Sequence, residues 1–232
     1  FDDCELIIIN ANSPQNEDKY INEFMKENKN VVYKKLDYRA TVMETENMAL
    51  KMSKGQLFAQ SCVDDAHAME YLETLAKHLY FTEDVDLVYA DCLQTNEPLE
   101  TFENNSSGGN RYEHSLNSFS KENMIKCLPG PMPMWRKTVH DKCGYFNEDL
   151  AHAGDWEMFL RMVDGGSKFK KIDKPLGLYY YNSEGLSTSQ EYALKRGKEE
   201  ASVFFKYKSV FGKRDYQRYE GYFKQFLKEI EI

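Results

Sequence analysis

Two adjacent carboxylates, Asp64 and Asp65, follow a short apolar run and precede an amphipathic segment. Adjacent carboxylates repel each other unless a cation or a helix N-terminus lies nearby. A hard divalent cation takes oxygen ligands and commonly bridges carboxylates to the phosphates of a substrate. The alternative interpretation is that Asp65 only caps a helix beginning near Ala66. The spacing alone leaves metal binding and helix capping both open.

A third acid, Asp155, stands in the sequence His152-Ala-Gly-Asp-Trp-Glu157. It is predicted to open a helix whose apolar side includes Trp156 and Phe159. A carboxylate held at a helix start can act as a cap, as a general base, or as both, because a base must reach the proton that it abstracts. His152, taken alone, fits a loop or packing position better than a ligand position.

Trp135 and Arg136 follow three prolines within six residues, so we expect them on a stiff segment. One interpretation is a core tryptophan beside a surface arginine. The other is an aromatic platform and a positive charge that line a cleft for a polar substrate. The sequence pattern is compatible with either.

Short β-branched runs alternate with amphipathic segments along the first 90 residues. This alternation predicts βαβ units and a mostly parallel sheet covered by helices, in which ligands bind beyond the carboxyl ends of the strands. Two polar clusters, Asn10 to Ser13 and Asp64-Asp65, follow such ends, so we expect one active face. The predicted strands are 5–10, 31–36, 56–60 and 86–90, and the predicted helices are 16–27, 42–53 and 67–79.

The segment from Thr95 to Ser120 is rich in Asn, Ser, Gly and Glu and predicts a mobile lid over the substrate. Two helices are expected at 137–143 and 156–163, and two strands at 169–172 and 176–181. Helix is expected from Thr188 onward, with an aromatic stripe that either packs into the core or contacts another copy or domain.

The composition excludes several classes of protein. The chain has 232 residues, 41% of them hydrophobic and 29% charged, as in a soluble globular protein. A net charge of −8 argues against nucleic-acid binding, and no run is long enough to span a membrane. Five cysteines, an odd number without CxxC spacing, predict reduced thiols in a cytoplasmic protein. The acidic start Phe1-Asp2-Asp3 does not resemble a signal peptide, which needs positive charge there. The missing initiator Met suggests further residues upstream.

Six segments, in order, resemble family 2 glycosyltransferases of the GT-A fold, of the non-processive bacterial and viral kind. The resemblance runs from Glu5 to about Ser187. The segments are Glu5-Leu-Ile-Ile-Ile-Asn-Ala-Asn-Ser, Glu46-Asn-Met-Ala-Leu-Lys-Met-Ser-Lys-Gly55, Ser61-Cys-Val-Asp-Asp65, Asp86-Leu-Val-Tyr-Ala-Asp91, Met134-Trp-Arg-Lys with Gly144-Tyr-Phe-Asn-Glu, and Gly154-Asp-Trp-Glu-Met-Phe-Leu-Arg161.

The resemblance implies an α/β GT-A catalytic domain over residues 1–187, with a helical extension over 188–232 packed on it. It implies an inverting transfer of a sugar from a UDP- or GDP-linked donor to a hydroxyl of a glycan, lipid-linked or protein-bound acceptor. It also implies a location in the cytoplasm or at its membrane face, and the C-terminal helices are candidates for dimerisation or for contact with a further domain.

The resemblance also assigns residues by position. Asp64, supported by Asp65, is implied to bind Mn²⁺ or Mg²⁺, and Asp155 is implied to be the general base. The donor side would include Asn10, Asn12, Arg39 and Asp65, and the acceptor side would include Trp135, Arg136 and His152.

The sequence also departs from the family pattern. Cys62 stands where the first Asp of the Asp-x-Asp motif is usual, and the family's first strand is absent from this sequence. No Gln-x-x-Arg-Trp motif follows Asp155, which argues against processive synthesis. Two alternatives therefore remain: a catalytically inactive domain that binds nucleotide or glycan, and a sugar nucleotidyltransferase, which releases pyrophosphate.

Overall fold

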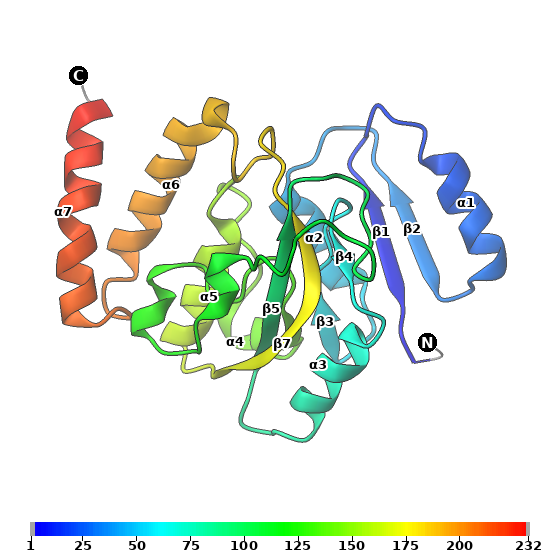
Figure 1. The fold of residues 1–232 in the computed structure, drawn as a ribbon, viewed down its shortest axis with the longest axis horizontal. Helices are drawn as coiled ribbons and strands as arrows, with labels where there is room; N and C mark the ends of the chain where they lie inside the picture. Colours follow the sequence, from blue (N-terminus) through cyan, green and yellow to red (C-terminus); the bar gives the residue numbers. More distant parts are fainter. Residues whose placement is uncertain (1–2, 231–232) are drawn as a thin grey trace.

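The structure, a computed structural model, describes residues 3–230 and alternates strands with helices (Figure 1). The strands are β1 (Leu6–Asn10), β2 (Val31–Lys35), β3 (Leu57–Ala59), β4 (Ala66–His67), β5 (Leu87–Thr95), β6 (Met134–Arg136) and β7 (Phe169–Tyr180). The α-helices are α1 (Asp18–Glu27), α2 (Val42–Met52), α3 (Tyr71–Tyr80), α4 (Val139–Cys143), α5 (Gly154–Asp164), α6 (Ala193–Lys206) and α7 (Lys213–Ile230). Three short 3₁₀ helices are η1 (Glu113–Leu116), η2 (Glu122–Ile125) and η3 (Gln190–Tyr192).

The central sheet has five strands in the order β3-β6-β5-β7-β4. The expected α/β architecture is confirmed, but this sheet is mixed rather than mostly parallel. β5 and β7 run parallel, whereas β6 lies antiparallel to both β3 and β5, and the short edge strand β4 lies antiparallel to β7. The two strands expected at 169–172 and 176–181 form the single strand β7, whose register shifts against β5 opposite Asp91.

β1 and β2 form a separate parallel pair, with α1 on its outer side (Figure 1). Within residues 3–230, β1 pairs only with β2 and β3 pairs only with β6, so each keeps one edge without a strand partner. The expectations that a first strand is missing and that further residues precede Phe1 stay predictions.

Alternating side chains of β5 build two hydrophobic cores, one on each face of the central sheet. Leu87 and Tyr89 pack with Trp135, α5 and the C-terminal helices, while Val88 and Ala90 pack with α3. α2 begins with a capping box between Thr41 and Glu44 and adds Met43 and Leu50 to the first core. This packing holds α5 against the sheet. It also sets the positions of the loops that follow the carboxyl ends of β5 and β7.

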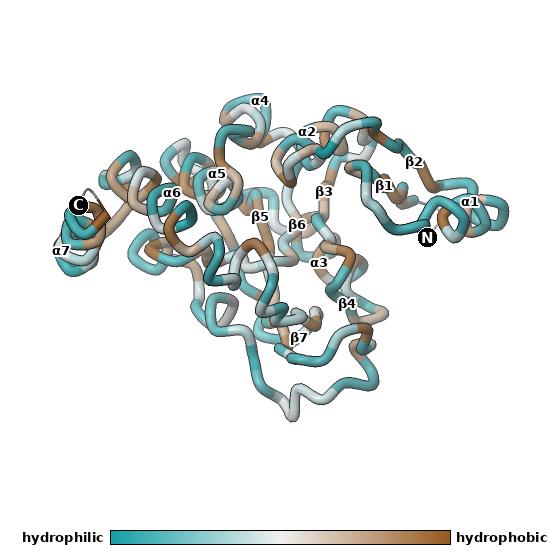
Figure 2. Tube along the Cα trace, turned by 90° about the horizontal axis from the view of Figure 1, so that it is seen from above, coloured by the Kyte–Doolittle hydropathy of each residue, from teal (hydrophilic) through white to brown (hydrophobic). Residues whose placement is uncertain are grey.

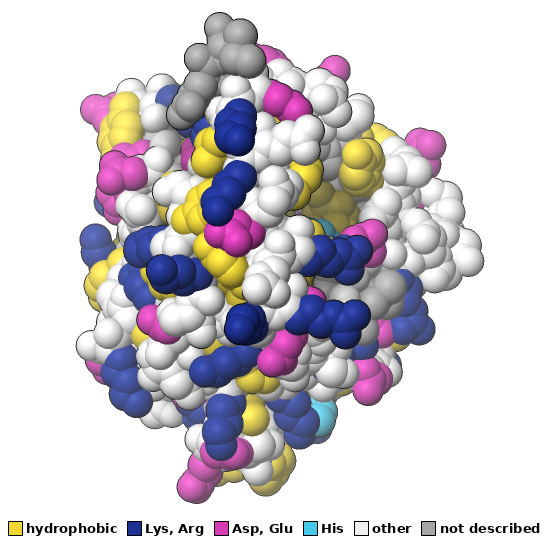
Figure 3. All heavy atoms as spheres, turned by 90° about the vertical axis from the view of Figure 1, so that its left-hand side faces the viewer, with side chains coloured by type: hydrophobic (Ala, Val, Ile, Leu, Met, Phe, Trp, Pro, Cys, Tyr) yellow, Lys and Arg dark blue, Asp and Glu magenta, His cyan; other side chains and the backbone are white. Residues whose placement is uncertain are grey.

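The aromatic stripe of the C-terminal helices belongs to the first core. Phe204, Phe211 and Phe223 are buried there, and Phe204 stacks on Tyr216 with ring centroids 4.9 Å apart. Along α6 and α7 hydrophobic residues alternate with hydrophilic ones (Figure 2), and the outer surface on this side carries many lysines and arginines (Figure 3). The core interpretation of the stripe is confirmed for these buried residues, whereas Tyr222 of the same stripe is exposed. The domain division at 187 and a homodimer stay predictions.

One buried carboxylate ties α5 to α6. Glu157, 2% exposed, accepts hydrogen bonds from Arg161 of its own helix at 2.7 Å and from Lys206 and the Tyr207 hydroxyl at 2.8 and 2.5 Å. Burial raises the pKa of Glu157, but these three donors outweigh it and lower that pKa overall. In the described part of the chain, no helix has the length and apolar composition needed to cross a bilayer.

Candidate active site

Asp64 and Asp65 lie in the loop between β3 and β4, beside the carboxyl end of β7. The Asp65 carboxylate accepts a hydrogen bond from the Tyr180 backbone N–H at 3.0 Å, which fixes it to the last residue of that strand. The residues after Asp65 form β4, and α3 begins only at Tyr71. Asp65 is therefore not a helix cap, and the capping interpretation of the sequence is wrong.

Together with Cys62, the two aspartates form a compact group of metal-ligating atoms. One such atom from each of Cys62, Asp64 and Asp65 lies within 4.8 Å of the other two. Among residues 3–230, no lysine, arginine or histidine forms an ion pair with Asp64, Asp65 or Asp155. Paired acids without a basic partner leave negative charge that a cation can neutralise.

The electrostatics of this group follow from its burial. Burial raises the pKa of Asp65 to about 7, and the charge of Asp64 adds to the effect, while the Tyr180 N–H opposes it. Burial also raises the pKa of the Cys62 thiol, with further contributions from Asp65, Asp64 and, more weakly, Glu46. Cys62 is therefore a neutral thiol at pH 7. Burial alone raises the pKa of Glu46, on the adjacent α2, to about 7.

Replacing Asp65 by Asn should raise the Tm of the metal-free chain at pH 8 by roughly 2–8 °C and have little effect at pH 4. The pKa of Asp65 is about 7 in the folded chain against 3.8 for a model carboxyl, so folding stability is lost as pH rises from about 4 through 7. The Asn carbonyl can still accept the Tyr180 N–H. Thermal unfolding in EDTA across this pH range measures the difference, and Asp149→Asn, an exposed acid, is the control. An equal effect at both pH values contradicts the prediction.

Asp155 is the second residue of α5, and two donors hold its half-buried side chain. Oδ1 accepts from the Trp156 backbone N–H at 2.7 Å, and Oδ2 accepts from the Cys127 thiol, whose Sγ is 3.6 Å away. The preceding loop is fixed by Glu199 of α6, whose carboxylate accepts three backbone N–H groups, from Ala151, His152 and Ala153. Burial raises the pKa of Asp155. The site therefore presents a fixed carboxylate of raised basicity.

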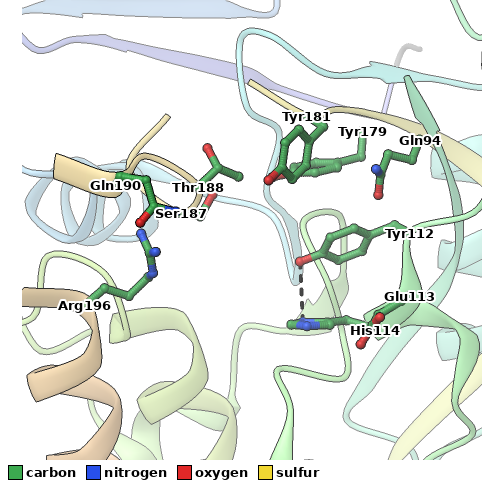
Figure 4. Close-up of a pocket in the computed structure, with 10 residues that line it drawn as sticks. All are labelled: Gln94, Tyr112, Glu113, His114, Tyr179, Tyr181, Ser187, Thr188, Gln190 and Arg196. Carbon is green, nitrogen blue, oxygen red and sulfur yellow. Dashed lines mark hydrogen bonds between the residues drawn. The ribbon is translucent and has the colours of Figure 1, made fainter. Parts of the chain in front are cut away.

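A polar and aromatic pocket of about 430 Å³ opens at the carboxyl ends of β5 and β7 (Figure 4). Tyr179 and Tyr181 line it. They are the residues before and after Tyr180, whose backbone N–H donates to Asp65. Tyr112 faces Tyr179 with ring centroids 4.6 Å apart, and its hydroxyl lies 3.4 Å from His114 Nδ1. The remaining lining residues are Gln94, Glu113, Ser187, Thr188, Gln190 and Arg196.

Both acidic centres act electrostatically on tyrosines that line the pocket. The charges of Asp65 and Asp64 raise the pKa of Tyr179, after the larger effect of burial. Asp155 has the same effect on Tyr112, again after burial. One wall of the pocket therefore lies within electrostatic range of the Asp64-Asp65 loop and another within range of Asp155, although none of the three acids is among the lining residues.

The polar segment 95–120 folds against β5. Gln94 and Tyr112 donate backbone hydrogen bonds to Asn110 and Cys92 at 2.8 and 2.9 Å, and Glu100 holds the turn by accepting from Thr95 and Ser106. The segment lines the pocket with Tyr112, Glu113 and His114, while a closing motion over the substrate stays a prediction.

Trp135 and Arg136 do not line this pocket. Trp135 is 1% exposed, and its indole N–H donates to His140 Nε2 at 2.9 Å inside the first core. Arg136 donates to three carbonyls in the segment that leads from α3 into the start of β5, those of Val85, Leu79 and Thr82. Burial in the core contradicts the acceptor-side prediction for Trp135, because the prolines before it make the segment stiff without exposing it. Arg136 is half-buried and lies outside this pocket, and its acceptor-side role stays a prediction.

The other predicted residues lie in loops or at strand ends. His152 places Nδ1 3.1 Å from the Leu186 carbonyl, in the loop that carries Ser187 and Thr188, but it is not among the pocket-lining residues. Asn10 is buried at the end of β1, where its oxygen accepts the Ser13 N–H and its amide donates to Tyr33 and Glu17. Its polar atoms thus shape the turn.

Asn12 and Arg39 lie at the ends of the neighbouring strands β1 and β2. Asn12 has a φ of 58° and donates to the Asp37 carbonyl at 3.3 Å, and Arg39 is exposed. Sequence reasoning missed Cys127, Tyr112, Tyr179 and Arg196. For Tyr179, the available signal was its place at the carboxyl end of a predicted strand.

Comparisons with known proteins agree with this architecture. Residues 1–144 match the profile of Glycosyl transferase family 2. A protein of Bacillus subtilis (strain 168), "Uncharacterized glycosyltransferase YwdF", is 26% identical over 157 residues, which cover 65% of this chain and 54% of that protein. The chain spans about half the length of such relatives.

Two solved structures share the fold. S. aureus TarS 1–349 superposes with a TM-score of 0.63 at 17% identity, covering 88% of this chain and 56% of that one. The mannosyltransferase PcManGT from Pyrobaculum calidifontis, solved with GDP-Man and Mn²⁺, gives a TM-score of 0.63 at 13% identity, covering 87% and 54%. The expected GT-A fold is thus confirmed, and with the profile match over more than half its length the chain belongs to glycosyltransferase family 2.

Proposed function

We propose that this chain transfers a sugar from a nucleotide-sugar donor to a hydroxyl acceptor, with inversion at the anomeric carbon and with help from a divalent cation. One observation carries the proposal: a pocket is joined through Tyr180 to an acidic group without a basic partner, and it lies within electrostatic range of a single fixed carboxylate of raised basicity. Such a site has one face for the leaving phosphate and another for the attacking oxygen.

Asp64 and Asp65 fit a divalent cation, with Cys62 beside them. The oxygens of the two carboxylates suit Mn²⁺ or Mg²⁺, and their ligand atoms converge with the Cys62 Sγ within 4.8 Å. A cation held there supplies positive charge against the departing nucleoside diphosphate. The Mn²⁺ and GDP-Man in the solved PcManGT structure support this assignment.

Asp155 accepts the proton of the acceptor hydroxyl. The acceptor oxygen then attacks the anomeric carbon while the bond from that carbon to the phosphate oxygen breaks, and the nucleoside diphosphate leaves with the bonding pair. Because attack and departure take place on opposite sides of the carbon, a single displacement inverts it. No second carboxylate is needed as a nucleophile.

The aromatic pocket supports an acceptor that carries a sugar ring. Tyr112, Tyr179 and Tyr181 offer ring faces for the apolar face of a sugar, and Gln94, Ser187 and Thr188 offer hydrogen bonds to its hydroxyls. Asn12 and Arg39, at the ends of β1 and β2, are the proposed contacts for a UDP- or GDP-linked donor. We further propose that the enzyme is cytoplasmic and non-processive, and that its acceptor is a glycan, lipid-linked or protein-bound.

A product analysis tests the proposal. The chain is incubated with UDP- and GDP-sugars, Mn²⁺ and a panel of glycan acceptors, and the nucleotide products are separated by chromatography. The proposal expects a nucleoside diphosphate and a glycoside of inverted anomeric configuration. In a second incubation, with UTP or GTP, Mn²⁺ and a sugar 1-phosphate, release of pyrophosphate and formation of a nucleotide sugar would instead identify a nucleotidyltransferase. Nucleotide binding without turnover on any donor and acceptor pair would identify an inactive binding domain, the alternative suggested by Cys62.

A further inference from the structure

The carboxylate of Asp155 is held by two neutral donors that come from different parts of the fold. The Trp156 N–H belongs to α5 itself, at 2.7 Å from Oδ1. The Cys127 thiol belongs to the segment between η2 and β6, and its Sγ lies 3.6 Å from Oδ2. Hydrogen bonds from sulfur are longer than those from oxygen. A distance of 3.6 Å therefore fits a hydrogen bond from the thiol to the carboxylate.

The backbone that carries Cys127 is firmly placed. The Cys127 carbonyl accepts the Gly130 N–H at 3.1 Å, and Gly130 has a φ of 66°, which closes a turn that most other residues would strain. Leu128 is fully buried beside it. The Trp156 indole N–H donates to the Met124 carbonyl at 2.8 Å, so η2 and α5 are joined next to the thiol.

We propose that Cys127 is a positioning residue for Asp155: its thiol fixes the rotation of the carboxylate, so that the base keeps one orientation toward the pocket. The inference rests on the proposed role of Asp155 as the base. The thiol is neither a nucleophile nor a metal ligand in this proposal, and it acts only through the carboxylate that it contacts.

A thiol suits this task because it orients a base without weakening it much. Burial and the nearby Asp155 raise the pKa of Cys127 well above its usual value, so the group stays protonated and remains a donor. A hydroxyl or a cation would donate more strongly, stabilise the charged carboxylate and lower its basicity.

Among the described residues, no positive charge is among the influences on the pKa of Asp155. Asp155 is among the charges that raise the pKa values of Cys62, Tyr112 and Glu200, each after the larger effect of burial, so these groups surround it from the β3–β4 loop, the 95–120 segment and α6. None of them is a cation. Arg196 of α6 lowers the pKa of Glu200, but it is not among the influences on the pKa of Asp155. Cys127 is thus the side chain that holds Oδ2 among groups that leave the carboxylate basic.

The test compares Cys127→Ser and Cys127→Ala in the full chain, with Cys143→Ser as the matched control. Cys143 is another half-buried thiol, and its Sγ lies 3.9 Å from the Arg161 carbonyl, away from Asp155. The pKa of Asp155 is measured by ¹³C NMR on aspartate-labelled protein, with the resonance assigned from Asp155→Asn. Thermal unfolding confirms that each variant is folded.

We expect Cys127→Ser to lower the pKa of Asp155 and Cys127→Ala to raise it, each by roughly 0.5–1 pH unit, with no change in Cys143→Ser. In transfer assays the acid limb of the rate profile should move in the same direction. Cys127→Ala should lower kcat about tenfold at an unchanged donor KM, and Cys127→Ser should restore most of it because it regains a donor.

Identical Asp155 pKa values in all folded variants would overturn the inference, as would equal kcat losses for Ser and Ala. The proposed function is separable from this result. If Asp155→Asn abolishes transfer while the Cys127 variants leave its pKa and the rate profile unchanged, only the positioning role fails. If the pKa responds but Asp155→Asn retains transfer, the contact is real, the base assignment fails, and the positioning role fails with it.

Discussion

Replacing Asp155 by Asn should lower the rate of sugar transfer by about 10²–10⁴-fold and leave nucleotide binding nearly unchanged. The amide has the size of the carboxylate. It keeps an oxygen that can accept the Trp156 N–H, which in the parent chain donates to Oδ1 at 2.7 Å. It cannot accept a proton from the attacking hydroxyl. Single-turnover kinetics with saturating nucleotide sugar, together with calorimetry of nucleotide binding, separates the loss of chemistry from a loss of affinity.

Two comparisons make this result specific to the base. Asp149→Asn changes an exposed acid in the loop before α5 and should leave the rate within about twofold of the parent chain. In the parent chain the rate should fall as pH decreases through the pKa of Asp155, because the protonated acid no longer accepts a proton. Burial raises that pKa, so the fall should begin at a higher pH than for an exposed aspartate. An Asp155→Asn variant that keeps more than about a tenth of the activity rejects the assignment.

The sequence predicted the elements of this fold where short-range patterns determine them. α2 was expected at 42–53 and runs from Val42 to Met52, because a capping box and an apolar face act together there. The direction of β6 and the union of two expected strands in β7 were not predictable in this way. Both depend on pairing with β5, which the chain reaches only after long connections.

The acids of the site were predictable because they follow strand ends or open a helix, whereas the pocket was not. Tyr112, Tyr179 and Arg196 come from three different elements of the fold. The parallel pairing of β5 and β7 brings Tyr112, which follows β5, to Tyr179 on β7, and the docking of α6 adds Arg196. Trp135 shows the opposite error. Its proline-rich approach is equally compatible with a cleft and with a core, and packing against Phe58, Phe146 and Phe159 decides for the core.

Replacing Asp64 by Ala should weaken Mn²⁺-dependent binding of UDP or GDP by roughly 100-fold or more. Cys62 stands where the family pattern has an acid, and it is a neutral thiol at pH 7, so Asp64 and Asp65 supply the two carboxylates of the metal-ligating group. Removing Asp64 leaves Asp65 as the only carboxylate ligand of that group. Calorimetric titration of each nucleotide with Mn²⁺ and with EDTA measures the effect. Asp84→Asn is the matched control, because Asp84 is an exposed aspartate whose partner is Lys168.

The same titration distinguishes the roles of Cys62 and Asp64. Cys62→Asp restores the acid of the family pattern and should strengthen Mn²⁺-dependent nucleotide binding if the cation lies in this group, because a carboxylate is a better ligand for a hard cation than a neutral thiol. Asp64→Ala should reverse that gain. Nucleotide binding that is independent of Mn²⁺ and equal in the parent chain, Asp64→Ala and Cys62→Asp would mean that no cation takes part, and that the donor phosphates are held elsewhere.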